Sequence, residues 1–316
     1  MRIVRFNSIT EPVSCARTGL VLAGDTIADL RAGYAKYLLE EARDVQGREI
    51  AALRIPADVR HILHVGGPAR AAIEAAAGWL AELQARIPDA CGVDGEPLFT
   101  PISQARLHNP LKPGRLIVVR GNASGSADAP VVWNRAQASV MGPVRDIPLP
   151  ATLQGLAYGT GIAIVIGKRC HAVSERDALA CIGGYMVANE VEAFRTAGAG
   201  KLAGDMAFRR CIIGPHLVDA ADVGAVESLR MTTRVNGDTC QTGSMDDLKV
   251  GIAPLIAALS AHALEPGDVI VTALLSDIAP PGGWTVPLLR AGDVLESEIE
   301  TLGLMRNKVV IEGAHA

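Results

Sequence analysis

The sequence predicts an α+β protein in which a small N-terminal α/β module, residues 1–105, precedes a strand-rich C-terminal domain, residues 106–316. Three observations predict this. Residues 68–87 are rich in alanine, with leucine and isoleucine at helical spacing. From about residue 101 the texture changes to short β-branched runs separated by glycine and proline, which is typical of strands. Only two helical segments interrupt those runs.

The module contributes four predicted elements. Residues 2–6 and 19–22 are predicted strands, and residues 28–42 have apolar residues at helical spacing. Residues 68–87 form a longer predicted helix, whose alanine stripe serves packing and implies no chemistry.

The C-terminal domain contributes the remaining elements. A helix is expected after Ser174, because Glu175 follows this capping residue closely, and another is expected at residues 245–262. Residues 121–130 (GNASGSADAP) are of low complexity and are interpreted as a flexible connection or a shortened lid. The predicted strands are residues 116–119, 162–166, 230–235, 269–272, 294–299 and 308–311.

Composition excludes several classes of function. The 316 residues include 30 basic and 34 acidic side chains, and only 3% are aromatic, so neither a basic face nor stacking platforms for nucleic acid are expected. No apolar run reaches the roughly 18 to 20 residues of a membrane span. The basic N-terminus lacks an apolar signal core, and the six cysteines contain no CxxC pair. We therefore expect a cytoplasmic protein with reduced and mostly buried thiols.

Generic catalytic motifs are missing from the sequence. The seven histidines include no HExxH, and there is no P-loop, GxSxG or strand-linked GxGxxG. Nucleotide binding and a histidine zinc site therefore have no support.

Two groups of carboxylates remain. Glu190 and Glu192 would point to the same side of a strand and could together hold a hard divalent cation, but we interpret them as solvated residues where a strand frays into a loop. A later group is interpreted as the solvent-facing side of an antiparallel sheet. Its members are Asp293, Glu296, Glu298 and Glu300.

Three passages resemble segments of the fumarylacetoacetate hydrolase family. Residues 264–272 (LEPGDVIVT) are similar to its LxPGDxIxTGTP segment, and residues 292–303 (GDVLESEIETLG) are similar to its closing GDxxxxEIxxLG segment. Residues 235–241 (VNGDTCQ) are similar to its VNGxxxQ. With weaker matches between them, these passages follow the family's order over residues 110–309.

This resemblance implies a mixed β-roll core with flanking helices, and usually a homodimer. It also implies chemistry on 2-oxo acids and 1,3-diketo acids, by hydrolases, decarboxylases, isomerases, tautomerases or dehydratases. Family members generally use Mg²⁺, Mn²⁺ or Ca²⁺ held by carboxylates, so that the metal stabilises an enolate.

The chain departs from the family at the metal ligands. Where the family's strand has two glutamates, this sequence has Gly159 and Gly161, and the third ligand position is Glu190. The family's lid with a His/Glu dyad, which activates water, corresponds to residues 121–130 and contains no histidine. Two of three metal ligands and the usual base are therefore missing.

Other family positions retain polar residues. The family lysine falls on Asp205 or, with an insertion, on Lys201, and the FxK lysine becomes Arg135. The resemblance thus implies Glu190, Lys201 and Asp205 as candidate catalytic residues. The candidate substrate-binding residues are Arg135, Tyr158, Gln241 and Thr272.

Three functions stay open. The first is a diverged enzyme that acts without a metal on a 2-oxo or 1,3-dicarbonyl carboxylic acid, as a decarboxylase, isomerase, dehydratase or cyclase. The glycines at the ligand positions would then enlarge the pocket. The second is a non-catalytic scaffold or binding protein, favoured if Phe194, Phe208 and Trp133 fill the pocket. The third is an ordinary metal-dependent carbon–carbon bond hydrolase, with Mg²⁺ or Mn²⁺ held by Glu190 and Glu192. In each case we expect a homodimer with a small carboxylate ligand, and no nucleic-acid or membrane partner.

Overall fold

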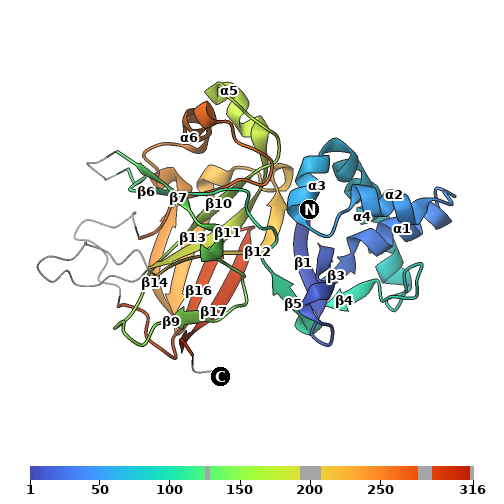
Figure 1. The fold of residues 1–316 in the computed structure, drawn as a ribbon, viewed down its shortest axis with the longest axis horizontal. Coiled ribbons are helices and arrows are strands. Elements are labelled where there is room, and N and C mark those ends of the chain that lie inside the picture. The colour runs from blue at the N-terminus through green and yellow to red at the C-terminus, as the bar shows by residue number, and fades with distance from the viewer. Residues whose placement is uncertain (125–128, 193–207, 277–286, 314–316) are drawn as a thin grey trace, which may run out of the picture.

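The computed structural model describes residues 1–124, 129–192, 208–276 and 287–313. The first third of the chain carries four helices and five short strands (Figure 1, blue to teal). The strands are β1 (Arg2–Ser8), β2 (Arg17–Leu22), β3 (Thr26–Asp29), β4 (Phe99–Pro101) and β5 (Ala105–His108). The helices are α1 (Leu30–Glu40), α2 (Gly47–Arg54), α3 (Val59–Val65) and α4 (Gly67–Arg86).

The rest of the chain is mostly strand. Its helices are α5 (Glu175–Ala178) and α6 (Ile252–Leu259). Its strands are β6 (Leu116–Arg120), β7 (Val131–Arg135), β8 (Val140–Met141), β9 (Ile147–Leu149), β10 (Ala157–Ile166), β11 (Ile182–Glu192), β12 (Arg209–Asp219), β13 (Arg230–Val235), β14 (Asp238–Ser244), β15 (Val269–Thr272), β16 (Val294–Ile299) and β17 (Gly303–Ile311).

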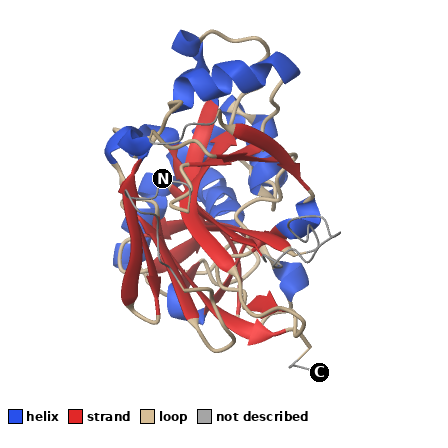
Figure 2. Cartoon of the chain, turned by 90° about the vertical axis from the view of Figure 1, so that its left-hand side faces the viewer, coloured by secondary structure: helices blue, strands red, loops and turns tan. Residues whose placement is uncertain are grey.

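Two sheets organise the described residues. The larger has 12 strands in the order β4-β3-β2-β1-β12-β11-β10-β15-β6-β7, with β5 added to β1 and β8 added to β12. The smaller has the order β14-β13-β16-β17-β9. In the turned view the helices lie around the outside of these strand layers (Figure 2). The α+β class with a mixed β-roll is therefore confirmed.

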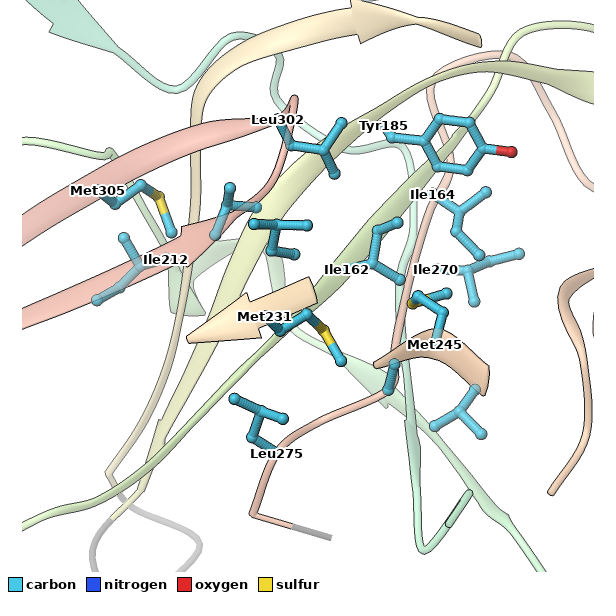
Figure 3. Close-up of a cluster of buried hydrophobic side chains, with 14 of the residues drawn as sticks. Ile162, Ile164, Tyr185, Ile212, Met231, Met245, Ile270, Leu275, Leu302 and Met305 are labelled. Atoms are coloured by element: carbon cyan, nitrogen blue, oxygen red, sulfur yellow. The ribbon is translucent and has the colours of Figure 1, made fainter. Parts of the chain in front are cut away.

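The larger sheet separates two hydrophobic cores. The core between the two sheets contains Ile162, Ile164, Tyr185, Met231 and Met305 (Figure 3). The opposite face of β10 and β11 packs, through residues such as Ala163, Val165 and Met186, against helices α1 to α4. Because β1 pairs with β12, one sheet and one core run through both predicted domains. The larger sheet therefore continues across the domain boundary predicted at residue 105.

Local structure agrees with most predicted elements and corrects some. Residues 28–42 begin in strand β3, and α1 begins only after Asp29, whose side chain accepts a hydrogen bond from the backbone N–H of Ala32 at 3.0 Å. Helices α2 and α3 were not predicted. The helix predicted at residues 245–262 is shorter, because a 3₁₀ turn at Met245–Asp247 precedes α6 and another at Ser260–His262 follows it. None of the described helices is long and apolar enough to cross a membrane.

Two members of the late carboxylate group, Glu296 and Glu298, lie on the outer side of the smaller sheet, as predicted, whereas Asp293 and Glu300 flank strand β16. Buried and partly exposed residues alternate along β16, with the glutamates on the partly exposed side. Arg234 contacts Glu298 at 2.6 Å, and Arg306 contacts Glu296 at 3.2 Å. These ion pairs are surface pairs of a solvated sheet.

Candidate functional site

The first pair of glutamates is built into the centre of the larger sheet. Glu190 lies opposite Gly159 of β10 and Cys211 of β12. Side chains two residues apart share a face of a strand, so Glu192 points to the same side as Glu190. Both are buried, with 2% and 5% of their surface exposed. The interpretation of these residues as a fraying, solvated end is therefore wrong, because β11 stays paired on both edges through Glu192.

Arginines from three other strands neutralise these carboxylates. Arg135 of β7 approaches Glu190 at 3.4 Å. Arg120 of β6 lies 2.8 Å from Glu192, and Arg209 of β12 lies 3.3 Å from the same carboxylate. We call these five residues the arginine–glutamate cluster. Among the described residues the cluster brings three guanidinium groups to two carboxylates.

Arg135 carries an unused donor in this cluster. Its side chain is 8% exposed, and its Nε is buried without a hydrogen-bond partner among the described residues. A guanidinium has five N–H donors in a fixed fork that matches the geometry of a carboxylate. Arg135 is therefore placed to bind a further anion beside Glu190.

Trp133 forms an exposed wall beside the arginines. Its ring centroid lies 5.6 Å from Cζ of Arg135 and 5.8 Å from Cζ of Arg209, within the range of cation–π contacts. The tryptophan is 39% exposed, whereas Phe208 belongs to the core between the sheets, on the other side of β12. Phe194 lies outside the described residues. A pocket filled by these aromatic residues would favour a scaffold, but neither Trp133 nor Phe208 fills the site.

Burial changes the acidity of Glu190. Desolvation raises its pKa above the ordinary value of 4.5, Arg135 opposes this shift, and the nearby charge of Glu192 adds to it. Cys211, which pairs with Glu190 across the strands, is fully buried, and burial likewise raises its thiol pKa. A buried carboxyl whose pKa is raised is a better proton acceptor near neutral pH than an exposed one.

The two glycines at the family's ligand positions do not leave open space. A Cβ on Gly159 would lie 2.5 Å from Oγ of Ser276, and one on Gly161 would lie 2.6 Å from the carbonyl oxygen of Thr272 and 2.9 Å from Cδ2 of Leu274. The expected enlargement of the pocket is therefore wrong, because residues 272–276 pack against this part of β10.

The described residues do not fit a divalent metal. Both glutamates are engaged by guanidinium groups, which compete with a dication for the carboxylate oxygens. No group of three His, Cys, Asp or Glu side chains in the described ranges could hold a metal ion. Glu190 and Glu192 share a face of the strand, but no third described His, Cys, Asp or Glu side chain lies beside them to complete a metal site. We therefore derive no chemical step through a metal.

The predicted site residues separate into three sets. Glu190 and Arg135 meet in the cluster. Tyr158 and Thr272 lie on the opposite face of the sheet, because Tyr158 is adjacent to Gly159 on β10 and Thr272 pairs with Ile162. Thr272 accepts a hydrogen bond from Asn122 at 3.2 Å, and Gln241 lies buried on β14 of the smaller sheet. Lys201 and Asp205 lie outside the described residues. Tyr158, Gln241 and Thr272 do not belong to the cluster, and their roles in substrate binding stay predictions.

Sequence reasoning missed a polar network directly behind Glu190. The Asn189 amide donates to Oγ of Ser297 at 2.6 Å and to Oγ1 of Thr160 at 3.3 Å. Thr160 is also 2.7 Å from the hydroxyl of Thr233, so four buried side chains join the two sheets. The network fixes the register of β11 and so the position of Glu190. The only signal in the sequence was an asparagine and a threonine inside apolar runs.

Sequence reasoning also missed Arg120 and Arg209. Each stands at an end of a strand, next to residues without a motif, so nothing local marks it as a partner of Glu192. Only the order β12-β11-β10-β15-β6-β7 brings them together.

Comparisons with known proteins agree with this architecture. Residues 114–310 match the family model described as fumarylacetoacetate (FAA) hydrolase C-terminal. A human protein named as a mitochondrial oxaloacetate tautomerase is 33% identical over 190 residues, which is 57% of this chain and 59% of that protein. A 2,4-didehydro-3-deoxy-L-rhamnonate hydrolase from Sphingomonas sp. (strain SKA58) is 33% identical over 186 residues, covering 57% of this chain and 65% of that protein. Both matches span less than two thirds of the relative's length.

Solved structures show the same fold. A maleylpyruvate hydrolase from Sphingobium sp. SYK-6, in complex with manganese (II) and pyruvate, has a TM-score of 0.66 and 24% identity, covering 98% of this chain and 99% of that chain. A 2-hydroxyhepta-2,4-diene-1,7-dioate isomerase from Mycobacterium marinum has a TM-score of 0.56 and 28% identity, covering 68% of this chain and 81% of that chain. The first likeness, at its low identity, shows the fold alone.

Proposed function

Because the chain belongs to the fumarylacetoacetate hydrolase family, we propose that it binds a small 2-oxo or 1,3-dicarbonyl carboxylic acid at the arginine–glutamate cluster and isomerises it without a metal. The observation that carries this proposal is the pairing of Glu190, buried and with a raised pKa, with Arg135, whose Nε has no partner among the described residues. Glu190 supplies the base, and the guanidinium of Arg135 stabilises the negative charge that develops on the substrate.

The chemistry is a proton shift next to a carbonyl. The ionised Glu190 takes a proton from the carbon beside the carbonyl, and the electron pair of that C–H bond moves to the carbonyl oxygen. The guanidinium of Arg135 stabilises the resulting enolate. Return of the proton from Glu190 to a different atom gives the isomer, so no redox partner or water is consumed.

The substrate's carboxylate fits the cationic side of the cluster. Arg135 and Arg209 lie on either side of the glutamates, and each has more N–H donors than its contacts with the described glutamates use. Trp133 covers both guanidinium groups and limits their contact with water. A planar, conjugated acid can lie against this indole ring.

The names of the relatives support an enolising reaction. One is called an oxaloacetate tautomerase, and another a 2-hydroxyhepta-2,4-diene-1,7-dioate isomerase. Both names describe movement of a proton within a carboxylic acid. For this chain the reaction, its independence of metal, the homodimer and the cytoplasmic location belong to the proposal.

A non-catalytic binding protein is the second candidate. It is favoured by the packing of Leu274 and Ser276 against the glycine positions, which leaves less room beside β10 than an open catalytic cage would need. In that case the cluster would bind the carboxylate without moving a proton.

Hydrogen–deuterium exchange separates these functions. We expect the protein, treated with EDTA and assayed in D₂O, to accelerate deuterium incorporation at the carbon beside the carbonyl of oxaloacetate or pyruvate, followed by NMR. Glu190→Gln should lower the rate by about 10² to 10⁴-fold. Glu298→Gln, which removes a carboxylate from the outer side of the smaller sheet, is the matched control and should exchange like the wild type.

The other outcomes are equally clear. Exchange at the buffer rate, with oxalate still stabilising the protein in a thermal-shift assay, would support the non-catalytic candidate and contradict the isomerase. Exchange that appears only after Mg²⁺ or Mn²⁺ is added would restore the metal-dependent enzyme.

A further inference from the structure

A small basic hollow lies between the N-terminal strands and the C-terminal domain, away from the arginine–glutamate cluster. Its volume is about 120 Å³. We propose that this hollow is a binding site for a phosphate-sized oxyanion. It is lined by Arg5, Leu107, His108, Asn109, Lys112, Val140, Gly142 and Arg145.

The fold brings the basic residues together from distant parts of the chain. Arg5 of β1 lies opposite His108 of β5. Val140 belongs to β8. Strands β8 and β1 pair with the same edge of β12, and β1 pairs nearer the C-terminal end of β12. The turn from Gly142 to Arg145 closes the hollow, with the backbone N–H of Arg145 donating to the Gly142 carbonyl at 3.3 Å. The hollow therefore fills the gap between β1 and β8.

The charges in this lining are unbalanced. Among the described residues that line the hollow, all four ionisable ones are basic and none is Asp or Glu. Within the described part of the chain, the side chains of Arg5, Lys112 and Arg145 make no hydrogen bond or ion pair, and Nε of Arg5 is buried without a partner. A buried N–H donor without an acceptor is costly, and an oxyanion would supply the missing acceptor.

The surroundings of His108 show the same excess of positive charge. Its Nε2 lies 2.5 Å from Oδ1 of Asn7, which holds the ring in place. Burial lowers its pKa, and the charges of Arg5 and Arg106 lower it further. An anion in the hollow would offset this repulsion. The forked guanidinium of Arg5 matches two oxygens of a phosphate group, and Lys112 and Arg145 can approach from the solvent side.

This site differs from the arginine–glutamate cluster in its ligand. In the cluster, glutamates pair with the arginines. In the hollow no carboxylate of the described lining competes for the basic groups, and the volume suits a phosphate rather than a conjugated acid. The inference does not depend on the proposed isomerase.

Isothermal titration of the full chain with inorganic phosphate tests the proposal, with ionic strength held constant by sodium chloride. We expect saturable binding, and at least a tenfold loss of affinity in Arg5→Gln. Arg176→Gln removes an exposed arginine on α5, far from the hollow in the sequence and without a described partner, and should bind like the wild type. Glycerol 3-phosphate is titrated in parallel. Equal affinity assigns free phosphate, and tighter binding assigns the phosphate group of a larger metabolite.

Three results would overturn the proposal. One is phosphate binding that Arg5→Gln leaves unchanged. Another is loss of binding in Arg120→Gln with retention in Arg5→Gln, which would place the phosphate in the cluster. The third is an equal response to chloride alone. If Arg5→Gln fails to fold, the exposed double variant Lys112→Gln/Arg145→Gln replaces it, with the same expected loss.

Discussion

Glu190 lies directly opposite Gly159 in the β10–β11 pair, so a buried carboxylate faces a backbone position without a side chain. Ser276 occupies the space where a side chain at residue 159 would begin. The charged partner of Glu190 among the described residues is Arg135, on a strand four places away in the sheet order.

The raised pKa of Glu190 predicts how stability depends on pH. A carboxyl whose pKa is higher in the folded state binds its proton more tightly there, so its contribution to the free energy of unfolding falls as pH rises from 4.5 through the folded pKa. Glu190→Gln removes this titration. We expect urea unfolding of wild type and variant at several pH values to show a difference in stability that shifts in favour of the variant as pH rises. A stability difference between wild type and variant that moves the other way with pH, or does not change, contradicts a raised pKa of Glu190.

Arg135 should control the acidity of the proposed base. Its charge lowers the pKa of Glu190, so Arg135→Gln should raise that pKa further. Because the ionised carboxylate is the base, the acid limb of the exchange-rate profile should move to higher pH, with a lower rate on the plateau. Arg234→Gln, at the surface pair with Glu298, is the matched control and should leave the limb in place. An unchanged limb in Arg135→Gln would show that Glu190 is not the base.

The tight packing beside β10 predicts a cost for small added side chains. Gly161→Ala should lower the free energy of unfolding by about 1 to 3 kcal/mol, because the new Cβ meets the backbone oxygen of Thr272. In contrast, Gly78→Ala in α4 meets nothing within 4 Å and should stabilise the protein by about 0.5 to 1 kcal/mol, since alanine is the better helix former. Thermal or urea denaturation measures both. A neutral Gly161→Ala would show that residues 272–274 move easily.

The Gly159 position allows a rescue experiment. Its nearest neighbour is the Ser276 side chain, so Ser276→Gly should recover part of the stability that Gly159→Ala loses. The same second change should not rescue Gly161→Ala, because the Thr272 backbone oxygen stays in place. Rescue of both variants, or of neither, would contradict this packing.

A buried aspartate should anchor the turn before β15. Oδ1 and Oδ2 of Asp268 accept hydrogen bonds from the backbone N–H and Nε of Arg115 at 2.8 and 2.9 Å, and Asp268 is 2% exposed. Arg115→Met should cost about 2 kcal/mol, less than a fully buried pair because the arginine side chain is 41% exposed. Arg169→Met breaks the exposed pair with Glu265 and should cost less than about 1 kcal/mol. Equal losses in the two variants would contradict this ranking.

Much of the fold could be predicted because its signals are local. The alanine-rich α4 and the short strands β6, β13, β15 and β16 appear in the sequence as helical spacing or β-branched runs. The family segments placed these elements in order, and the family is confirmed. The extent of β11 was not predictable, because Glu190 and Glu192 read as surface residues until their neighbours are known.

The sequence by itself determined the α+β class and the family, since each depends only on residue type and order along the chain. It also predicted that Gly159 and Gly161 stand where the family has two carboxylates. The tertiary structure alone decided that Glu190 is buried, that arginines from β6, β7 and β12 neutralise the glutamates, and that Ser276 and Leu274 pack against the glycines. The physical reason is that burial and electrostatic pairing depend on which strands are neighbours in the sheet. Those neighbours are far apart in the chain, so no local pattern records them.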